Sequence, residues 1–184
     1  MKKEISPDPP CPCGSGLPYS VCHGPVEHKL ALLRTRGERV PTRRLIKNAA
    51  QIEGIRRAGQ ANSLVLDAVE KAICPGMTTQ EIDDIVVRET RALGGVPAPL
   101  NYEGFPKSVC TSVNEQICHG IPSDKVVLKE GDIVNVDCTT RLDGYYGDAS
   151  RMFCLGPVSP EAKRLVDVTA QSVELAISHL TPYC

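Results

Sequence analysis

The sequence predicts an α+β domain, in which helices and antiparallel strands occupy separate stretches of the chain. Two observations carry this prediction. Residues 49–93 contain two successive patterns of apolar residues with a helical period. Residues 133–150 contain a β-branched run and then Asp143-Gly144, the dipeptide that closes two-residue hairpins. Helices followed by strands, without regular alternation, are typical of the α+β class.

The first predicted helix covers residues 49–73 and ends at Pro75-Gly76. Its apolar positions recur roughly every 3.6 residues; they are Ile52, Ile55, Ala58, Leu66, Val69 and Ile73. A second helix begins at the capping box Thr78-Thr79-Gln80-Glu81 and stops at Gly94-Gly95. The residues expected on its inner face are Ile82, Ile85, Val86 and Leu93.

A short strand at residues 109–113 precedes the hairpin, and residues 161–177 have the pattern of a last helix after Ser159-Pro160. Residues 133–136 are β-branched at three of four positions, which favours a strand. If Asp143-Gly144 alone forms the turn, the opposed residues are Leu142 and Tyr145, Thr139 and Asp148, and Asp137 and Ser150.

This register makes Asp137 and Asp148 diagonal neighbours on one face of the hairpin, with β-carbons about 7–8 Å apart. Two like charges at that range repel each other unless a cation lies between them, and carboxylate oxygens suit hard divalent ions. The pair therefore predicts a metal site. Aspartates near turns are also common for conformational reasons, which suffice for Asp143. They do not suffice for Asp137, because it ends an apolar strand where an unpaired charge is costly.

A second group of candidate ligands lies near the N-terminus and consists of Cys11, Cys13, Cys22 and His23. Thiolate and imidazole in a set of four favour tetrahedral Zn²⁺, and a site filled by four protein ligands is structural. A disulfide or free thiols are the alternative. A segment this short has little core of its own, so a bound metal would help it to fold.

Several motifs resemble those of the type I methionine aminopeptidases, which remove the initiator methionine from new proteins. They lie in residues 101–122, 131–137 and 147–150, and include Cys118-His119-Gly120-Ile121-Pro122 and Gly147-Asp148-Ala149-Ser150. The resemblance runs from about residue 52 to about residue 168. It implies the pita-bread fold, in which two pseudo-symmetric α+β halves surround a pair of divalent ions drawn from cobalt, manganese, iron or zinc.

The resemblance also implies roles for matching residues. Asp137 corresponds to a terminal metal ligand and Asp148 to the carboxylate that bridges both ions. His119 corresponds to the histidine that contacts the substrate amide and stabilises the transition state. The expected lining of the methionine pocket is Tyr102, Phe105 and Cys110. Without the resemblance, His119 could be a satisfied loop residue, Cys110 a small buried hydrophobe, and the two aromatics ordinary core residues.

The N-terminal ligands resemble the SEC-C zinc motif, which is appended to some bacterial methionine aminopeptidases. We therefore expect a zinc-binding motif at residues 1–25, a basic linker at 26–48 and the catalytic domain from 49 to 184. From Lys29 to Lys47 there are seven basic residues and one acidic residue. Such a segment is either a solvated linker or a surface that docks on ribosomal RNA near the nascent chain.

The family completes its metal site with one histidine and two glutamates from its second half. These motifs do not occur here, and His179 has no matching surroundings. We therefore expect the first half of a catalytic domain, inactive alone, which self-associates or binds a complementing fragment. The competing hypothesis is a non-catalytic zinc adaptor that binds a protein or ribosomal partner.

Composition predicts a cytoplasmic protein. The nine cysteines are an odd and scattered set, unlike a secreted disulfide framework. Met1-Lys2-Lys3-Glu4 is followed by no apolar stretch typical of a signal peptide, and no run of roughly 18 apolar residues could span a membrane. The net charge of −1 indicates no general attraction to nucleic acid.

Overall fold

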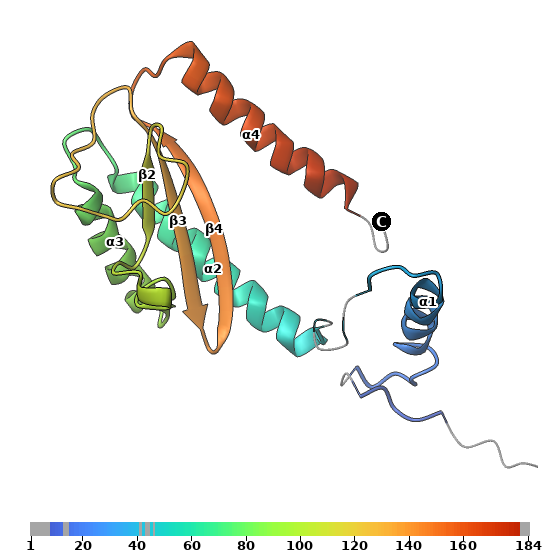
Figure 1. The fold of residues 1–184 in the computed structure, drawn as a ribbon. Helices are drawn as coiled ribbons and strands as arrows, with labels where there is room; N and C mark the ends of the chain where they lie inside the picture. The colour runs from blue at the N-terminus through green and yellow to red at the C-terminus, as the bar shows by residue number, and fades with distance from the viewer. Residues whose placement is uncertain (1–7, 13–14, 41, 43–44, 46, 181–184) are drawn as a thin grey trace, which may run out of the picture. The chain divides into compact units, whose positions relative to one another are not determined.

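A computed structural model describes residues 8–12, 15–40, 42, 45 and 47–180. The chain forms two compact units, Met1–Ile55 and Arg56–Cys184, and each is considered by itself. The elements in chain order (Figure 1) are α1 (Gly24–Thr35), α2 (Ala49–Ala72), α3 (Thr79–Ala92), β1 (Val96–Pro97), the 3₁₀ turn η2 (Tyr102–Gly104), β2 (Cys110–Val113), β3 (Ile133–Leu142), β4 (Tyr145–Cys154) and α4 (Pro160–His179). The predicted α+β class is confirmed.

The predicted hairpin is confirmed together with its register. Strands β3 and β4 pair antiparallel over ten residues each, and Asp143 and Gly144 alone form the turn, with φ angles of 50° and 81°. These positive angles match the right-handed twist of the paired strands. The opposed pairs are Leu142 with Tyr145, Thr139 with Asp148, and Asp137 with Ser150.

Strand β3 is the centre of the sheet. Strand β4 pairs with one of its edges along the whole length, while β1 and β2 pair antiparallel with different parts of the other edge. The two-residue strand β1 was not predicted from the sequence. It brings Val96 and Pro97 opposite Arg141 and Thr140, so the loop that follows α3 begins beside the turn end of β3.

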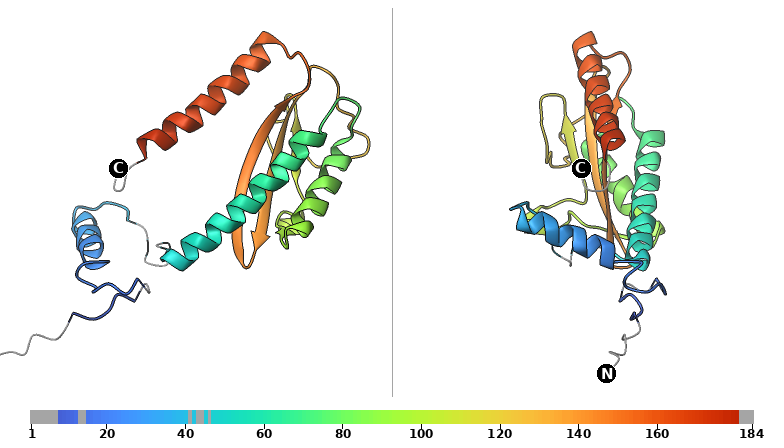
Figure 2. Two further views of the ribbon diagram at one scale, coloured as in Figure 1. Left: turned by 180° about the vertical axis from the view of Figure 1, so that it is seen from behind. Right: turned by 90° about the vertical axis from the view of Figure 1, so that its right-hand side faces the viewer.

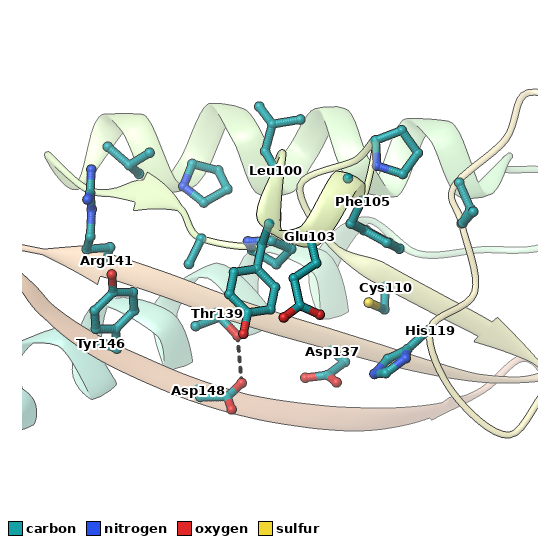
Figure 3. Close-up of a pocket in the computed structure, with 18 residues that line it drawn as sticks. Leu100, Glu103, Phe105, Cys110, His119, Asp137, Thr139, Arg141, Tyr146 and Asp148 are labelled. Carbon is teal, nitrogen blue, oxygen red and sulfur yellow. Dashed lines mark hydrogen bonds between the residues drawn. The ribbon is translucent and has the colours of Figure 1, made fainter.

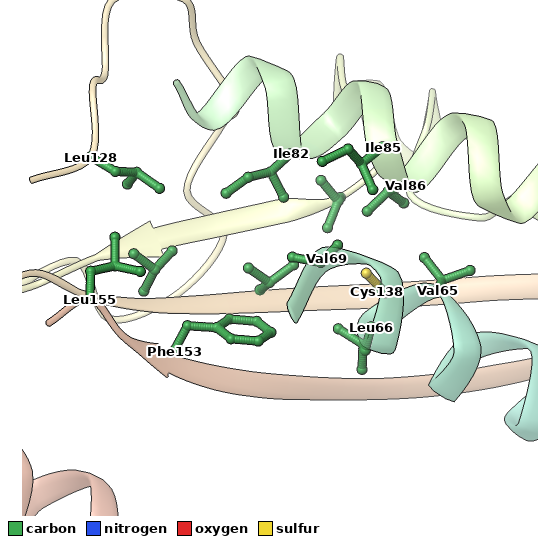
Figure 4. Packing of buried hydrophobic residues seen from close by; sticks show 13 residues of the cluster. Val65, Leu66, Val69, Ile82, Ile85, Val86, Leu128, Cys138, Phe153 and Leu155 are labelled. Atoms are coloured by element: carbon green, nitrogen blue, oxygen red, sulfur yellow. The ribbon is translucent and has the colours of Figure 1, made fainter. Parts of the chain in front are cut away.

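One face of the sheet packs on α2 and α3, as Figures 1 and 2 show from different sides. Buried residues alternate along β3, with Val134, Val136, Cys138 and Thr140 facing the helices. The core cluster (Figure 4) consists of Val65, Leu66 and Val69 of α2, Ile82, Ile85 and Val86 of α3, Val109, Leu128, Val134, Val136, Cys138, Phe153 and Leu155. Because successive side chains of a strand point to opposite faces, Asn135, Asp137 and Thr139 lie on the face away from the helices.

The helices begin close to where the sequence placed them, but not every apolar position is buried. The capping box of α3 is present, since Thr78 and Glu81 exchange both hydrogen bonds. Ile52 and Ile55 are exposed, although they follow the same apolar period as Ala58, which is buried where Gly147 approaches its carbonyl group. Leu93 is also exposed, since it caps the C-terminus of α3 beyond the residues packed on the sheet.

The last predicted helix is confirmed as α4, but none of its residues is buried. Its exposed apolar residues are Leu165, Val168, Val173, Leu175 and Ile177. Within the described chain α4 leads away from the sheet (Figure 1), so its apolar face is not part of the core formed by α2 and α3.

The segment expected as a basic linker begins with a helix that the sequence analysis did not predict. Helix α1 has a proline in its first turn and buries Leu30. It ends before Gly37, whose φ of +81° and N–H bond to the Arg34 carbonyl group are typical of a helix C-terminus. Arg43 and Arg44, two of the seven basic residues, lie outside the described residues.

Candidate active site and zinc-binding motif

A pocket of about 890 Å³ lies on the face of the sheet opposite α2 and α3. Its walls are the loop after β1, the start of β2, the segment around His119, and the facing sides of β3 and β4. The structure brings six sequence-predicted site residues into this pocket, namely Tyr102, Phe105, Cys110, His119, Asp137 and Asp148. Their chemical roles stay predictions.

The two carboxylates project from neighbouring strands into the pocket (Figure 3). Asp137 is half-buried on β3, and Asp148 is exposed on β4. The hydroxyl group of Thr139 donates a hydrogen bond of 2.7 Å to Oδ1 of Asp148. Among the described residues, neither carboxylate forms an ion pair with a lysine or arginine. The pair therefore presents negative charge to the pocket without a direct ion pair to a lysine or arginine among the described residues.

Electrostatics at Asp137 favour a bound cation. Burial raises the pKa of this carboxyl group above its usual range, the negative charge of Asp148 raises it further, and His119 opposes both effects. A divalent ion held between the two carboxylates would remove the repulsion that Asp137 experiences. The residues present therefore fit a hard divalent metal, although two carboxylates supply at most about four oxygen contacts.

His119 lies in the pocket beside Asp137 (Figure 3). Its φ of +56° is rare for a residue with a side chain, and such strain costs on the order of 1–3 kcal/mol. Neighbouring bonds hold the segment in place: the Gly120 carbonyl group accepts from the Thr111 N–H at 2.8 Å, and the Gly120 N–H donates to Ser112 Oγ at 3.2 Å. Strand β2 therefore fixes the position of His119.

Cys110 contributes a neutral wall to the pocket. It lies opposite Asp137 in the β2–β3 pairing and is buried. Burial raises the pKa of its thiol to about 11, with further contributions from Asp137, Cys118 and Asp148. The thiol therefore keeps its proton at neutral pH and behaves as a small polarizable group. Phe105 is half-buried and Tyr102 is 68% exposed, so neither is an ordinary core aromatic.

Among the pocket residues that the sequence analysis missed, four have polar or charged side chains, namely Glu103, Thr139, Arg141 and Tyr146. Thr139 could have been found, because the hairpin register already placed it opposite Asp148. Glu103 gave no signal: it reaches the pocket from a short turn in which its own φ is +49° (Figure 3).

Three of the four predicted zinc ligands converge in the N-terminal unit. The ligand atoms of Cys11, Cys22 and His23 all lie within 4.8 Å of one another. Nδ1 of His23 is 3.0 Å from Sγ of Cys11 and 3.3 Å from Sγ of Cys22. Cys11 is held by its N–H bond to the Leu17 carbonyl group, and the His23 carbonyl group accepts from the Glu27 N–H in the first turn of α1. The fourth predicted ligand, Cys13, lies outside the described residues.

Comparisons with known proteins find matches for both the N-terminal motif and the rest of the chain. Residues 53–184 match metallopeptidase family M24, and residues 10–25 match the SEC-C motif. Methionine aminopeptidase A of Synechocystis is 50% identical over 132 residues, which are 72% of this chain and 52% of that protein. The methionine aminopeptidase of Chlamydia trachomatis is 41% identical over 178 residues, which are 94% of this chain and 60% of that protein.

A solved structure supports the fold. The methionine aminopeptidase of Thermotoga maritima is 38% identical, with a TM-score of 0.73 over 74% of this chain and 55% of that one. This likeness confirms the predicted pita-bread fold for the part that the chain contains. The chain spans about half the length of the curated relatives it matches. None of the described helices combines the length and the hydropathy of a membrane-spanning segment. With a matched region that covers well over half of its residues, the chain belongs to metallopeptidase family M24.

Proposed function

We propose that this chain supplies the first half of the active site of a methionyl aminopeptidase, which hydrolyses the bond after the initiator methionine of nascent proteins. One observation carries the proposal: Asp137 and Asp148 face a single pocket together with His119 and a neutral, partly aromatic wall. The names of relatives that are 40–50% identical support it. Nascent chains emerge in the cytoplasm, which is the compartment we propose.

Asp137 and Asp148 are the residues that would hold a pair of divalent ions, drawn from cobalt, manganese, iron or zinc. When bound, such ions act as Lewis acids and lower the pKa of water. The protein contributes the charge and the direction of the two carboxylates, which lie diagonally across one hairpin face. Further donors are needed to complete six or more contacts around each ion.

The other pocket residues would act on the substrate. His119 lies close to Asp137, so its imidazole N–H could donate to the oxygen of the amide under attack as negative charge develops there. Cys110, Phe105 and Tyr102 would receive the methionine side chain, because an unbranched thioether fits an apolar and polarizable wall. The raised pKa of the Cys110 thiol keeps this wall uncharged at neutral pH.

Metal binding tests the proposal directly. We expect the chain, with zinc already supplied to its cysteines, to bind Mn²⁺ weakly, and Asp148→Asn to lose this binding. The control is Asp143→Asn, which changes a carboxylate of the same hairpin that pairs with Arg57 outside the pocket. Mn²⁺ titration followed by water-proton relaxation measures the difference. Equal binding by the parent and Asp148→Asn would remove the basis for a metallopeptidase site.

At the N-terminus, Cys11, Cys13, Cys22 and His23 are proposed to hold structural zinc. The convergence of three donors supports this, and the basic residues that follow are proposed to dock the chain near the ribosomal exit. A zinc adaptor without catalysis is the second candidate function. It is favoured by the assembled thiol and imidazole donors, which contrast with the two carboxylates of the pocket.

Zinc content provides a separate prediction. We expect one tightly bound Zn²⁺ per chain, which is lost in Cys22→Ser because removal of a thiolate leaves at most three donors. Cys74→Ser is the control, since it removes an exposed free cysteine outside the cluster. Elemental analysis after gel filtration measures both. Full zinc content in Cys22→Ser would exclude the proposed zinc site. A parent chain that binds zinc but no Mn²⁺ would favour the zinc adaptor.

A further inference from the structure

Thr139 is the only described residue that gives a side-chain hydrogen bond to either pocket aspartate. Its Oγ1–H donates to Oδ1 of Asp148 at 2.7 Å, and the two residues lie directly opposite each other on β3 and β4 (Figure 3). Asp148 is exposed, so without this bond its carboxylate would rotate freely in water. The contact therefore selects one orientation of the carboxylate.

The backbone around Thr139 is held from both sides. The buried Asn62 side chain of α2 donates to the Cys138 carbonyl group at 3.0 Å and accepts from the Thr140 hydroxyl group at 2.9 Å. The Thr139 carbonyl group itself accepts from the Ala98 N–H at 2.8 Å, which attaches the pocket loop to β3. Strand β3 cannot twist at this point without breaking these bonds, so the direction of the Thr139 hydroxyl group is well defined.

The side chain of Thr139 is chemically suited to orient a neighbouring carboxylate. Threonine is β-branched, so its χ1 angle is confined to few rotamers. Directly opposed residues of two antiparallel strands also have their side chains close enough to interact. A hydroxyl group has one hydrogen to donate, and an ionised carboxylate has about four acceptor positions on its two oxygens. The bond to Oδ1 therefore orients Asp148 while its other acceptor positions stay available to cations.

We propose that Thr139 is a positioning residue, whose hydroxyl group holds the Asp148 carboxylate in the orientation that binds divalent metal. This inference rests on the proposed function, in which Asp148 is a metal ligand. Hydrogen bonds that orient a ligand commonly change metal affinity by about 10- to 100-fold. A purely structural hydrogen bond would instead change the melting temperature and leave the metal affinity of the folded protein unaltered.

The test compares Thr139→Val with Thr139→Ser in the zinc-loaded chain. Valine keeps the shape and removes the donor, so we expect Mn²⁺ affinity to fall at least about tenfold. Serine restores the donor, so we expect affinity close to that of the parent. Ser150→Ala is the matched control, because it removes a hydroxyl group on the same face. Among the described residues, this hydroxyl group forms a side-chain hydrogen bond only with Asn135. Water-proton relaxation gives the affinities, and thermal unfolding shows that each variant is folded.

Equal affinity in Thr139→Val and the parent, with loss of binding in Asp148→Asn, overturns the inference and leaves the proposed function standing. Absence of Mn²⁺ binding in the parent overturns both. If Thr139→Val does not fold, Thr139→Ser and Thr139→Ala decide: serine must bind Mn²⁺ more tightly than alanine, and equal affinities contradict the role.

Discussion

We expect the 184-residue chain to release no methionine from the peptide Met-Ala-Ser when it is purified alone and supplied with Co²⁺, Mn²⁺ or Fe²⁺. The reason is the small number of predicted metal ligands. Asp137 and Asp148 provide at most about four oxygen contacts, whereas hard divalent ions take six or more. Metal should therefore bind weakly and water should stay poorly activated. Chromatographic quantification of free methionine against a buffer blank measures the outcome.

A contaminating peptidase would also release methionine, so the assay needs variants of the chain itself. Turnover that disappears in Asp148→Asn and persists in Asp143→Asn would come from this pocket and would contradict the prediction. Turnover that is equal in the parent and both variants would come from another protein. The two substitutions are chemically identical and lie in the same hairpin, five residues apart, but only Asp148 lines the pocket.

The second large effect is expected for Gly147→Ala, which should prevent stable folding of the catalytic part. Gly147 is buried on the helix-facing side of β4, and a β-carbon there would lie 2.3 Å from the Ala58 carbonyl oxygen and 2.6 Å from Cα of Gly59. These are backbone atoms of α2, so the whole helix or strand must move. Overpacking commonly lowers the free energy of unfolding by about 1–3 kcal/mol. We expect a larger loss here, because the atoms in the way belong to the backbone of a helix. Urea unfolding measures the loss.

Gly59→Ala provides the matched control on the opposing helix. A β-carbon at Gly59 meets no atom within 4 Å, so the added methyl group should fit. Because alanine is the better helix former, this variant should be stabilised by roughly 0.5–1 kcal/mol. The prediction fails if Gly147→Ala unfolds at the same urea concentration as the parent. Displacement of β4 would also move Asp148, so a folded Gly147→Ala variant should lose Mn²⁺ binding.

The parts of the structure that the sequence predicted are those determined by near neighbours. The register of β3 and β4 followed from Asp143-Gly144, because a two-residue turn leaves a single pairing, and Asp137 and Asp148 were thereby placed on one face. The capping box at Thr78 and Glu81 likewise marked the start of α3 correctly.

It was harder to predict which distant residues come together to line the pocket. Tyr102 and Phe105 reach it from a loop with three residues of positive φ, Asn101, Glu103 and Gly104. Asparagine and glycine favour this conformation, but the sequence offers no local signal for it at Glu103. The resemblance to a known family supplied these positions, and spacing alone did not. The burial of α2 was also misjudged at Ile52 and Ile55, because periodicity shows which face is apolar and does not show which residues of that face are covered.

By itself, the sequence determined helices α2, α3 and α4, the hairpin register, the acidic pair and the candidate zinc ligands, since short-range spacing, capping and turn chemistry decide them. Only the tertiary structure decided that Cys110 and His119 lie beside Asp137, that the Thr139 hydroxyl group donates to Asp148, and that α4 buries none of its apolar residues. These features depend on contacts between distant segments, where packing and charge act across space and leave no periodic trace in the chain.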